Sequence, residues 1–158
     1  MNDEAERRPA CVLDPASMDA ETGATLYPEP FRAAVAGRTR RRLGAALGLT
    51  GFGVNLTRLE PGASSALRHR HTREDEFVFI VEGEAVLRTD AGDTPLKAGM
   101  CAGFKAGDPD GHCLINLSDR PAVYLEMGNR VEGDEAHYPD DDLWYRDKTF
   151  YHRDGRPW

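Results

Sequence analysis

The sequence predicts an all-β protein in which antiparallel strands form a sandwich or a closed barrel. Its 158 residues include 16 glycines and 10 prolines, a content that favours many turns and short strands over long helices. Apolar segments of about five to eight residues are separated by turns rich in Gly, Pro and Asp, as in antiparallel β proteins. No strand-helix-strand alternation is visible, which argues against a parallel sheet.

The candidate strands cover residues 52–60, 65–71, 76–81, 85–89, 100–105, 111–117 and 122–127. We expect residues 1–48 to form an N-terminal arm with one short helix at about 38–47, packed on the barrel. Residues 49–128 would form the barrel itself, and residues 129–158 an irregular acidic and aromatic tail.

Composition excludes several classes of function. A formal net charge of −7 argues against a nucleic-acid partner, which would need a broad basic face. No apolar stretch approaches the roughly 18–20 residues of a membrane span, and the charged N-terminus does not resemble a secretory signal. The three cysteines are widely spaced and form no CxxC pair, which indicates reduced thiols and a cytoplasmic protein.

The segment LRHRHTREDEFVFIVEGE, residues 67–84, holds the chemically most informative residues. Side chains at positions i and i+2 of a strand share a face, so His69 and His71 point the same way. On the next strand Glu76 shares a face with Val78 and Ile80. If these faces line the interior, two imidazoles and a carboxylate converge in an apolar enclosure, which is costly unless something satisfies them.

A divalent transition metal would satisfy these groups, because neutral imidazole nitrogens and carboxylates are suitable ligands. His112 opens a later candidate strand and is the best fourth ligand, whereas His137 and His152 lie in the tail and are weaker candidates. The alternative is that these histidines are ordinary side chains satisfied by hydrogen bonds.

Residues 62–83 resemble the first motif of the cupin superfamily, a glycine, HxH, Glu and Gly, here filled by His69, His71, Glu76 and Gly83. Residues 99–116 resemble the second motif, which ends in HxxxN at His112 and Asn116, although Lys105 replaces the usual proline. The resemblance covers roughly half the chain. It implies a double-stranded β-helix, or jelly-roll, barrel that holds one divalent transition metal (Zn, Fe, Mn or Ni) through a 3-His-1-Glu set of His69, His71, Glu76 and His112. A degenerate cupin with an empty site is the alternative.

Four protein ligands leave one or two positions open on a five- or six-coordinate ion. One hypothesis is an enzyme of the dioxygenase, decarboxylase, isomerase or lyase type, acting on a small carboxylate, enol or sugar-like molecule. The other is a module that binds or senses a metal and a small ligand without turnover. Tyr124, Glu126, Arg58 and Lys105 are candidate acids or bases that the sequence cannot place. Fold alone does not decide between the two hypotheses.

Two surface features carry further expectations. Arg38, Arg40, Arg41 and Arg42 are expected on a solvated helix face or paired with the acidic residues 140–142. Phe77, Phe79 and Val81 should face outward from the strand that carries Glu76, and such an apolar patch needs a cover. The arm (Tyr27, Phe31) or the tail (Trp144, Tyr145) could cover it, but we favour a second subunit and therefore a homodimer.

Overall fold

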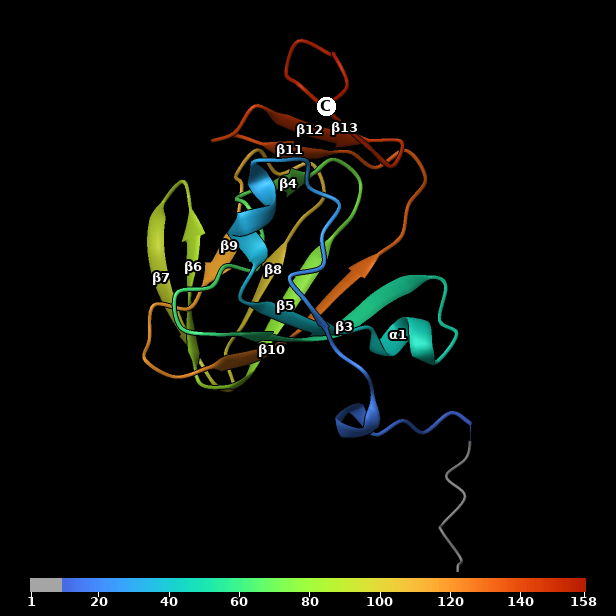
Figure 1. Cartoon of the computed structure of the whole chain (residues 1–158), viewed down its shortest axis with the longest axis vertical. Helices are drawn as coiled ribbons and strands as arrows, with labels where there is room; N and C mark the ends of the chain where they lie inside the picture. Colours follow the sequence, from blue (N-terminus) through green and yellow to red (C-terminus); the bar gives the residue numbers. More distant parts are fainter. Residues whose placement is uncertain (1–9) are drawn as a thin grey trace, which may run out of the picture.

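The computed structural model describes residues 10–158 and is built mainly of antiparallel strands (Figure 1). The strands are β1 (Glu21–Thr22), β2 (Arg38–Arg41), β3 (Phe52–Leu59), β4 (Arg70–His71), β5 (Glu76–Glu82), β6 (Glu84–Thr89), β7 (Gly92–Lys97), β8 (Cys101–Phe104), β9 (Cys113–Ile115), β10 (Ala122–Asn129), β11 (Ala136–Tyr138), β12 (Leu143–Arg146) and β13 (Thr149–Tyr151). The helical elements of this part of the chain are two 3-10 turns, η1 (Pro15–Ser17) and η2 (Phe31–Val35), and the short helix α1 (Leu43–Ala46). The predicted all-β class is therefore confirmed.

Two sheets enclose the main core. The larger has six strands in the order β1-β2-β3-β10-β5-β8, and the smaller has three in the order β7-β6-β9. Their inner faces contribute Leu59, Ile80, Tyr124, Leu96 and Leu114 to one buried apolar cluster. Burying side chains of this kind contributes about 1.5–3 kcal/mol each, so this cluster stabilises the barrel without help from the polar side chains at its mouth.

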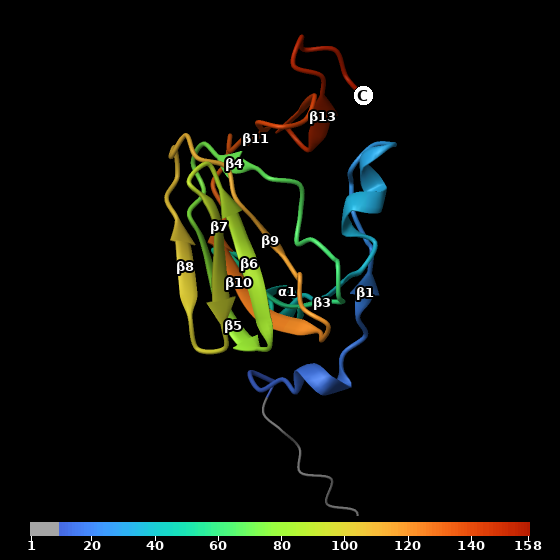
Figure 2. The ribbon, with the colours of Figure 1, turned by 90° about the vertical axis from the view of Figure 1, so that its left-hand side faces the viewer.

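The C-terminal tail is more regular than the sequence indicated. Strands β11, β12 and β13 pair with one another and with β4 to form a third sheet, in the order β13-β12-β11-β4, at one end of the molecule (Figures 1 and 2). Tyr138 and Leu143 of this sheet pack with Tyr27 and Val35 of the N-terminal arm in a second core. Residues 27–35 of the arm and the tail sheet therefore meet beside the strand that carries His71.

The predicted helix at 38–47 is correct only for its second half. Residues 38–41 form β2, which pairs with β3, and only Leu43–Ala46 are helical. The expectation for the arginines was accordingly wrong: Arg38 is buried, and Arg40 pairs with Glu126 instead of residues 140–142. Strand β7 was missed, because its sequence GDTPLK contains glycine, aspartate and proline, which are depleted in strands.

The alternation predicted for β5 is present. Val78 and Ile80 are buried, whereas Phe77, Phe79 and Val81 are 37%, 37% and 47% exposed. Among residues 10–158, Tyr27 and Phe31 of the arm and Tyr145 of the tail pack in the second core instead of over these three residues.

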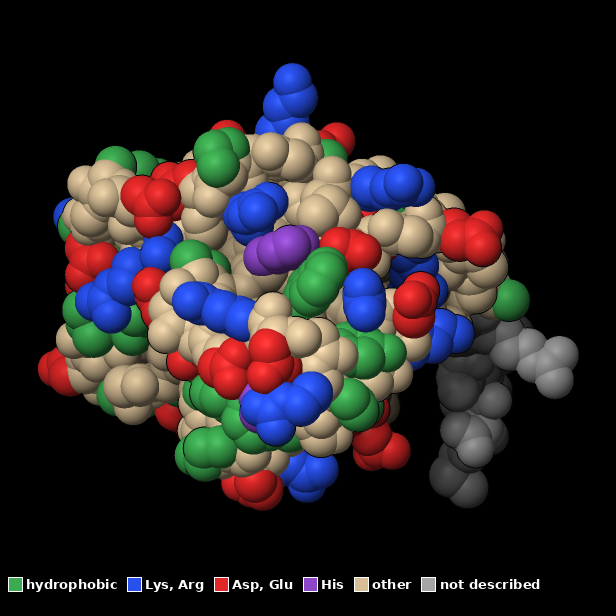
Figure 3. All heavy atoms as spheres, turned by 90° about the horizontal axis from the view of Figure 1, so that it is seen from above, with side chains coloured by type: hydrophobic (Ala, Val, Ile, Leu, Met, Phe, Trp, Pro, Cys, Tyr) green, Lys and Arg blue, Asp and Glu red, His purple; other side chains and the backbone are tan. Residues whose placement is uncertain are grey.

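One face of the molecule is mixed in charge. On the face seen in Figure 3, acidic and basic side chains are interspersed among apolar ones, with no continuous basic expanse. Among residues 10–158, no helix is long and apolar enough to cross a membrane.

Candidate metal centre

His69 and His112 are held side by side by their own backbones. The two residues form an antiparallel bridge in which His69 N donates to His112 O at 3.1 Å and His112 N donates to His69 O at 2.8 Å. Nδ1 of His69 lies 2.8 Å from the carbonyl oxygen of Leu67. Because a carbonyl only accepts hydrogen bonds, Nδ1 carries the proton and Nε2 presents a lone pair. The ring of His112 stacks on Phe104, with 3.5 Å between centroids.

His71 is positioned by the tail sheet. It pairs with Ala136 across β4 and β11, and its Nδ1 lies 2.5 Å from Oδ2 of Asp134. The other oxygen of Asp134 accepts hydrogen bonds from the backbone nitrogens of Arg73 and Glu74. Asp134 thus fixes the orientation of the His71 ring and leaves Nε2 free, which is the usual arrangement around a metal-binding histidine.

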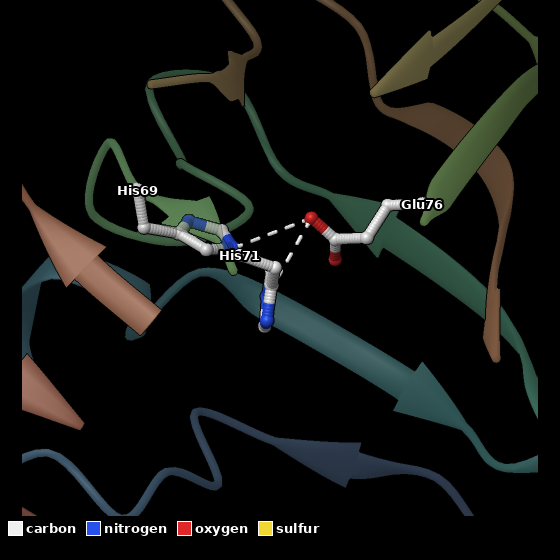
Figure 4. A group of neighbouring side chains, drawn as sticks. All are labelled: His69, His71 and Glu76. Atoms are coloured by element: carbon white, nitrogen blue, oxygen red, sulfur yellow. Dashed lines mark ion pairs between the residues drawn. The ribbon is translucent and has the colours of Figure 1, made fainter. Parts of the chain in front are cut away.

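The imidazoles converge on one oxygen of Glu76. Oε2 of Glu76 lies 3.7 Å from Nε2 of His69, 3.6 Å from Nε2 of His71 and 2.8 Å from Nε2 of His112. Figure 4 shows the first two side chains pointing at the carboxylate from β4 and the turn before it, while Glu76 enters from the start of β5. All four predicted ligands therefore lie together.

The charge states of three of these residues follow from their surroundings. Burial lowers the pKa of His69 to about 4, so its ring is neutral at pH 7. Burial opposes the charged form of His71 as well, but the carboxylates of Glu76 and Asp134 prevail and raise its pKa. Burial alone would raise the pKa of Glu76, yet the neighbouring imidazoles bring it to about 2. Neutral His69 and ionised Glu76 are the forms that bind metals.

Two features of the site fit a divalent metal: its set of donor atoms, and one buried oxygen that lacks a hydrogen bond of good geometry. Oε2 of Glu76 is buried and accepts no hydrogen bond of good geometry, despite the closeness of His112. His69, His71 and Glu76 have ligand atoms close enough together to hold one ion, and His112 adjoins them. An ion would satisfy the orphaned oxygen and the three nitrogen lone pairs at once.

The carboxylate of Glu76 and the imidazoles of His69 and His112 open into a cavity of about 260 Å³. His69, Glu76 and His112 line one part of it, and Arg40 and Glu126 line another. Of the candidate acids and bases, Tyr124 and Glu126 face this cavity, whereas Arg58 forms an exposed ion pair with Glu60 and Lys105 lines a separate, smaller pocket.

Comparison with known proteins identifies the family. A cupin domain model matches residues 55–128. A crystal structure described as a sugar phosphate isomerase of the cupin superfamily, from Silicibacter pomeroyi, is 44% identical and superposes with a TM-score of 0.89, covering 93% of this chain and 96% of that one. The chain belongs to the cupin superfamily.

Two further cupin structures resemble this one. A candidate sugar phosphate isomerase from Acidithiobacillus ferrooxidans is 29% identical, with a TM-score of 0.68 and coverage of 76% of each chain. A predicted oxalate decarboxylase from Thermotoga maritima, at 21% identity and a TM-score of 0.61, shares the fold over 76% of this chain and 99% of its own. A comparison with curated proteins found no match.

Several features of this cupin site were not foreseen from the sequence. Asp134 orients His71, and Tyr138 stacks on His69 with 5.6 Å between centroids, yet both come from the tail. The acidic tail composition was the only signal, and it does not single out one carboxylate. His137 and His152 pair with acidic residues of the tail instead of the candidate centre, as their weaker ranking implied.

Proposed function

We propose that this cupin is a metal-dependent isomerase that interconverts aldose and ketose forms of a sugar phosphate. The metal would be held by His69, His71, Glu76 and His112, the 3-His-1-Glu set expected from the sequence. The observation that carries the proposal is the 44% identity over nearly the whole of both chains with a protein described as a sugar phosphate isomerase.

The chemistry of the site is consistent with this reaction. A bound divalent ion would supply Lewis acidity, polarising a substrate carbonyl or hydroxyl oxygen. The protein's own groups provide a cavity of about 260 Å³ with polar and apolar walls, enough for a small sugar chain. His69 is neutral at pH 7 and Glu76 is ionised, so both can serve as ligands without first losing a proton.

Metal analysis followed by an activity screen tests the proposal. The protein is purified without a nickel column, its metal content is measured, and the ion found is restored to stoichiometry. Aldose and ketose phosphates of three to six carbons are then followed by NMR, with the same sugars lacking phosphate as matched controls. We expect conversion of one phosphorylated pair in the metal-loaded protein and none after chelation.

Two further measurements on the same metal-loaded protein, a thermal melt with each sugar phosphate and an oxygen-electrode assay, test the alternatives to the isomerase. Thermal stabilisation by a sugar phosphate without turnover would instead assign a binding or sensing module, which was the competing hypothesis. Oxygen consumption with an iron- or manganese-loaded protein would assign an oxygenase.

We also propose that the cupin is a homodimer joined through the outer face of the six-stranded sheet. Paired residues on adjacent strands share a face, which places Phe77 beside Met127 and Phe79 beside Leu125. Together with Val81 they form the outer patch, which is apolar across two strands and is left uncovered by the described residues of the chain ends. A two-fold dimer would cover the outer patch of both subunits with each other.

A cytoplasmic location completes the proposal. The three cysteines form no disulfide, and Cys11 and Cys101 are exposed, which suits a reducing compartment.

A further inference from the structure

An ion pair lies inside the barrel, in the same cavity as the candidate metal ligands. Nε of Arg40 is 2.7 Å from Oε1 of Glu126, and their side chains are only 21% and 23% exposed. Both residues line the cavity that His69, Glu76 and His112 also line. Neither residue is among the candidate metal ligands, so the pair requires its own explanation.

The sheet register explains how the pair forms. Arg40 of β2 is opposite Thr57 of β3, and Asn55 of β3 is opposite Glu126 of β10. Successive side chains of a strand point to opposite faces of the sheet, and paired residues share a face. The side chains of Arg40, Thr57, Asn55 and Glu126 therefore all face the interior. Glu126 accepts a hydrogen bond from Nδ2 of Asn55 at 3.0 Å, and the hydroxyl of Tyr124 lies 3.4 Å from its other oxygen.

The cluster is incompletely satisfied, which is unusual for a structural pair. The contact between Nε of Arg40 and Oε1 of Glu126 is an ion pair that lacks good hydrogen-bond geometry, so this buried nitrogen is satisfied by charge alone. A buried ion pair is often no more stabilising than apolar residues of the same size, and unsatisfied polar groups add a further cost. Charged groups kept at such a cost beside an open cavity are typical of a site that handles a ligand.

The position of Glu126 relative to the metal ligands suits a reacting carbon. Glu126 pairs with Val78, two residues along β5 from Glu76. Two residues along a strand and one strand across the sheet separate the backbones of Glu76 and Glu126 by about 8 Å. A substrate whose oxygens lie at the Glu76 end can therefore present the adjoining carbon atoms to the Glu126 carboxylate.

Building on the proposed isomerase, we propose that Glu126 is the catalytic residue that carries the proton between carbons 1 and 2 of the sugar phosphate. The Glu126 carboxylate removes the proton from carbon 2 of the open-chain aldose. The electrons of that C–H bond form the carbon 1–carbon 2 double bond, and the carbonyl electrons move to oxygen 1, which takes a proton. Glu126 exchanges its proton with water and then protonates carbon 1, while oxygen 2 loses its proton and becomes the ketose carbonyl. No oxidant or reductant is consumed.

Arg40 and Asn55 act as positioning residues in this scheme. The guanidinium holds one oxygen of Glu126, and the amide of Asn55 donates to the same oxygen. The other oxygen, which has only the long contact with Tyr124, is the one available to the substrate. The positive charge of Arg40 also compensates Glu126 whenever it is ionised.

The experiment compares Glu126→Gln with wild type in the metal-loaded full chain, using the sugar phosphate that the wild type converts. We expect kcat to fall about 10²- to 10⁴-fold, with metal content and KM within threefold of wild type. In deuterium oxide, the wild type should place solvent deuterium at carbon 1 of the ketose. In Glu126→Gln the rate of deuterium incorporation should fall by the same factor as kcat. Glu60→Gln is the matched control, because it removes the carboxylate of an Arg58–Glu60 pair of the same 2.7 Å length outside the cavity.

A second variant covers the case in which Glu126→Gln does not fold. Arg40→Met/Glu126→Gln removes both charges and leaves no unpaired guanidinium, and it too should bind metal and lack turnover. Either variant keeping kcat within threefold of wild type would overturn the role of Glu126. So would a defect confined to KM, or a wild-type reaction that transfers hydrogen from carbon 2 to carbon 1 without any solvent exchange. A wild type inactive on every sugar phosphate would instead refute the proposed isomerase itself.

Discussion

Oδ2 of Asp134 lies 2.5 Å from Nδ1 of His71, although 63 positions separate the two residues in the sequence. The contact exists because β11 folds back onto β4 and places the turn before it beside the His71 ring. A carboxylate in this position orients the imidazole and makes its other nitrogen a better ligand.

We therefore expect Asp134→Asn to weaken metal binding about 10- to 100-fold without removing a ligand. Competition with a chromophoric chelator measures the change. Asp142→Asn serves as the control, because Asp142 contacts Nδ1 of His152 at 2.7 Å in the same manner but outside the candidate centre. Equal metal affinity in Asp134→Asn and Asp142→Asn would show that the Asp134 contact is only structural.

The metal-free protein should respond to acid in a way that separates His69 from His71. The folded-state pKa of His69 is about 4, below the ordinary value of 6.5, so its contribution to stability is lost as the pH falls from 6.5 towards 4. The pKa of His71 is raised, so its contribution is present below pH 6.5 and is lost as the pH rises through the folded value.

Urea unfolding of the chelator-treated protein between pH 4 and 8 measures these contributions. His69→Gln should flatten the loss of unfolding free energy below pH 6.5, and His71→Gln should flatten the loss above it. Identical pH profiles for the two variants would contradict the different environments of the two rings.

Local alternation was enough to predict three of the four candidate ligands. His69 and His71 share a side and Glu76 shares a face with the buried Val78, because a strand has a period of two residues. Asp134 could not be predicted in this way, since its place depends on a tail sheet whose pairing partner is distant in the sequence. Arg40 was misassigned for a related reason: the run RTRRR has the charge of a solvated helix, and only pairing with β3 turns Arg40 inward.

Removal of a ligand should separate the metal centre from the fold. We expect His71→Ala to lose stoichiometric metal while it keeps the far-ultraviolet circular dichroism of wild type, because the main core contains none of the four candidate ligands. Elemental analysis and a thermal melt on the same sample make the comparison. A variant that cannot fold would mean that the ion is structural, and it would weaken the case for an isomerase.

Gly83 tests a backbone position that the cupin motif requires. Its φ is +73°, and a Cβ atom there would lie 2.5 Å from the carbonyl oxygen of Pro121. Gly83→Ala should therefore lower the free energy of unfolding by about 1–3 kcal/mol or more, through both backbone strain and the clash. Gly62→Ala is the control, because Gly62 has a φ of +82° but no atom within 4 Å of the added Cβ. If the urea midpoints of both variants shift equally, backbone strain alone explains the loss of stability in Gly83→Ala.

The outer patch of β5 and β10 leads to a prediction about assembly. Phe79 is 37% exposed, and its neighbour across the sheet is Leu125, so a charge at position 79 would enter the centre of the proposed dimer contact. Phe79→Asp should shift the protein from dimer to monomer, because an unpaired carboxylate cannot be buried there without a large cost. Metal content should remain near that of wild type, since the side chain points away from the cavity.

Light scattering over a range of concentrations measures the mass of each variant. Leu117→Asp is the control, because Leu117 is 63% exposed but lies outside the strands, in the segment after β9. We expect Leu117→Asp to keep the mass of wild type. A wild-type protein that stays monomeric at the highest concentration would refute the dimer. A dimeric Phe79→Asp variant would mean that the subunits join through another face and that the outer patch contacts water or a different partner.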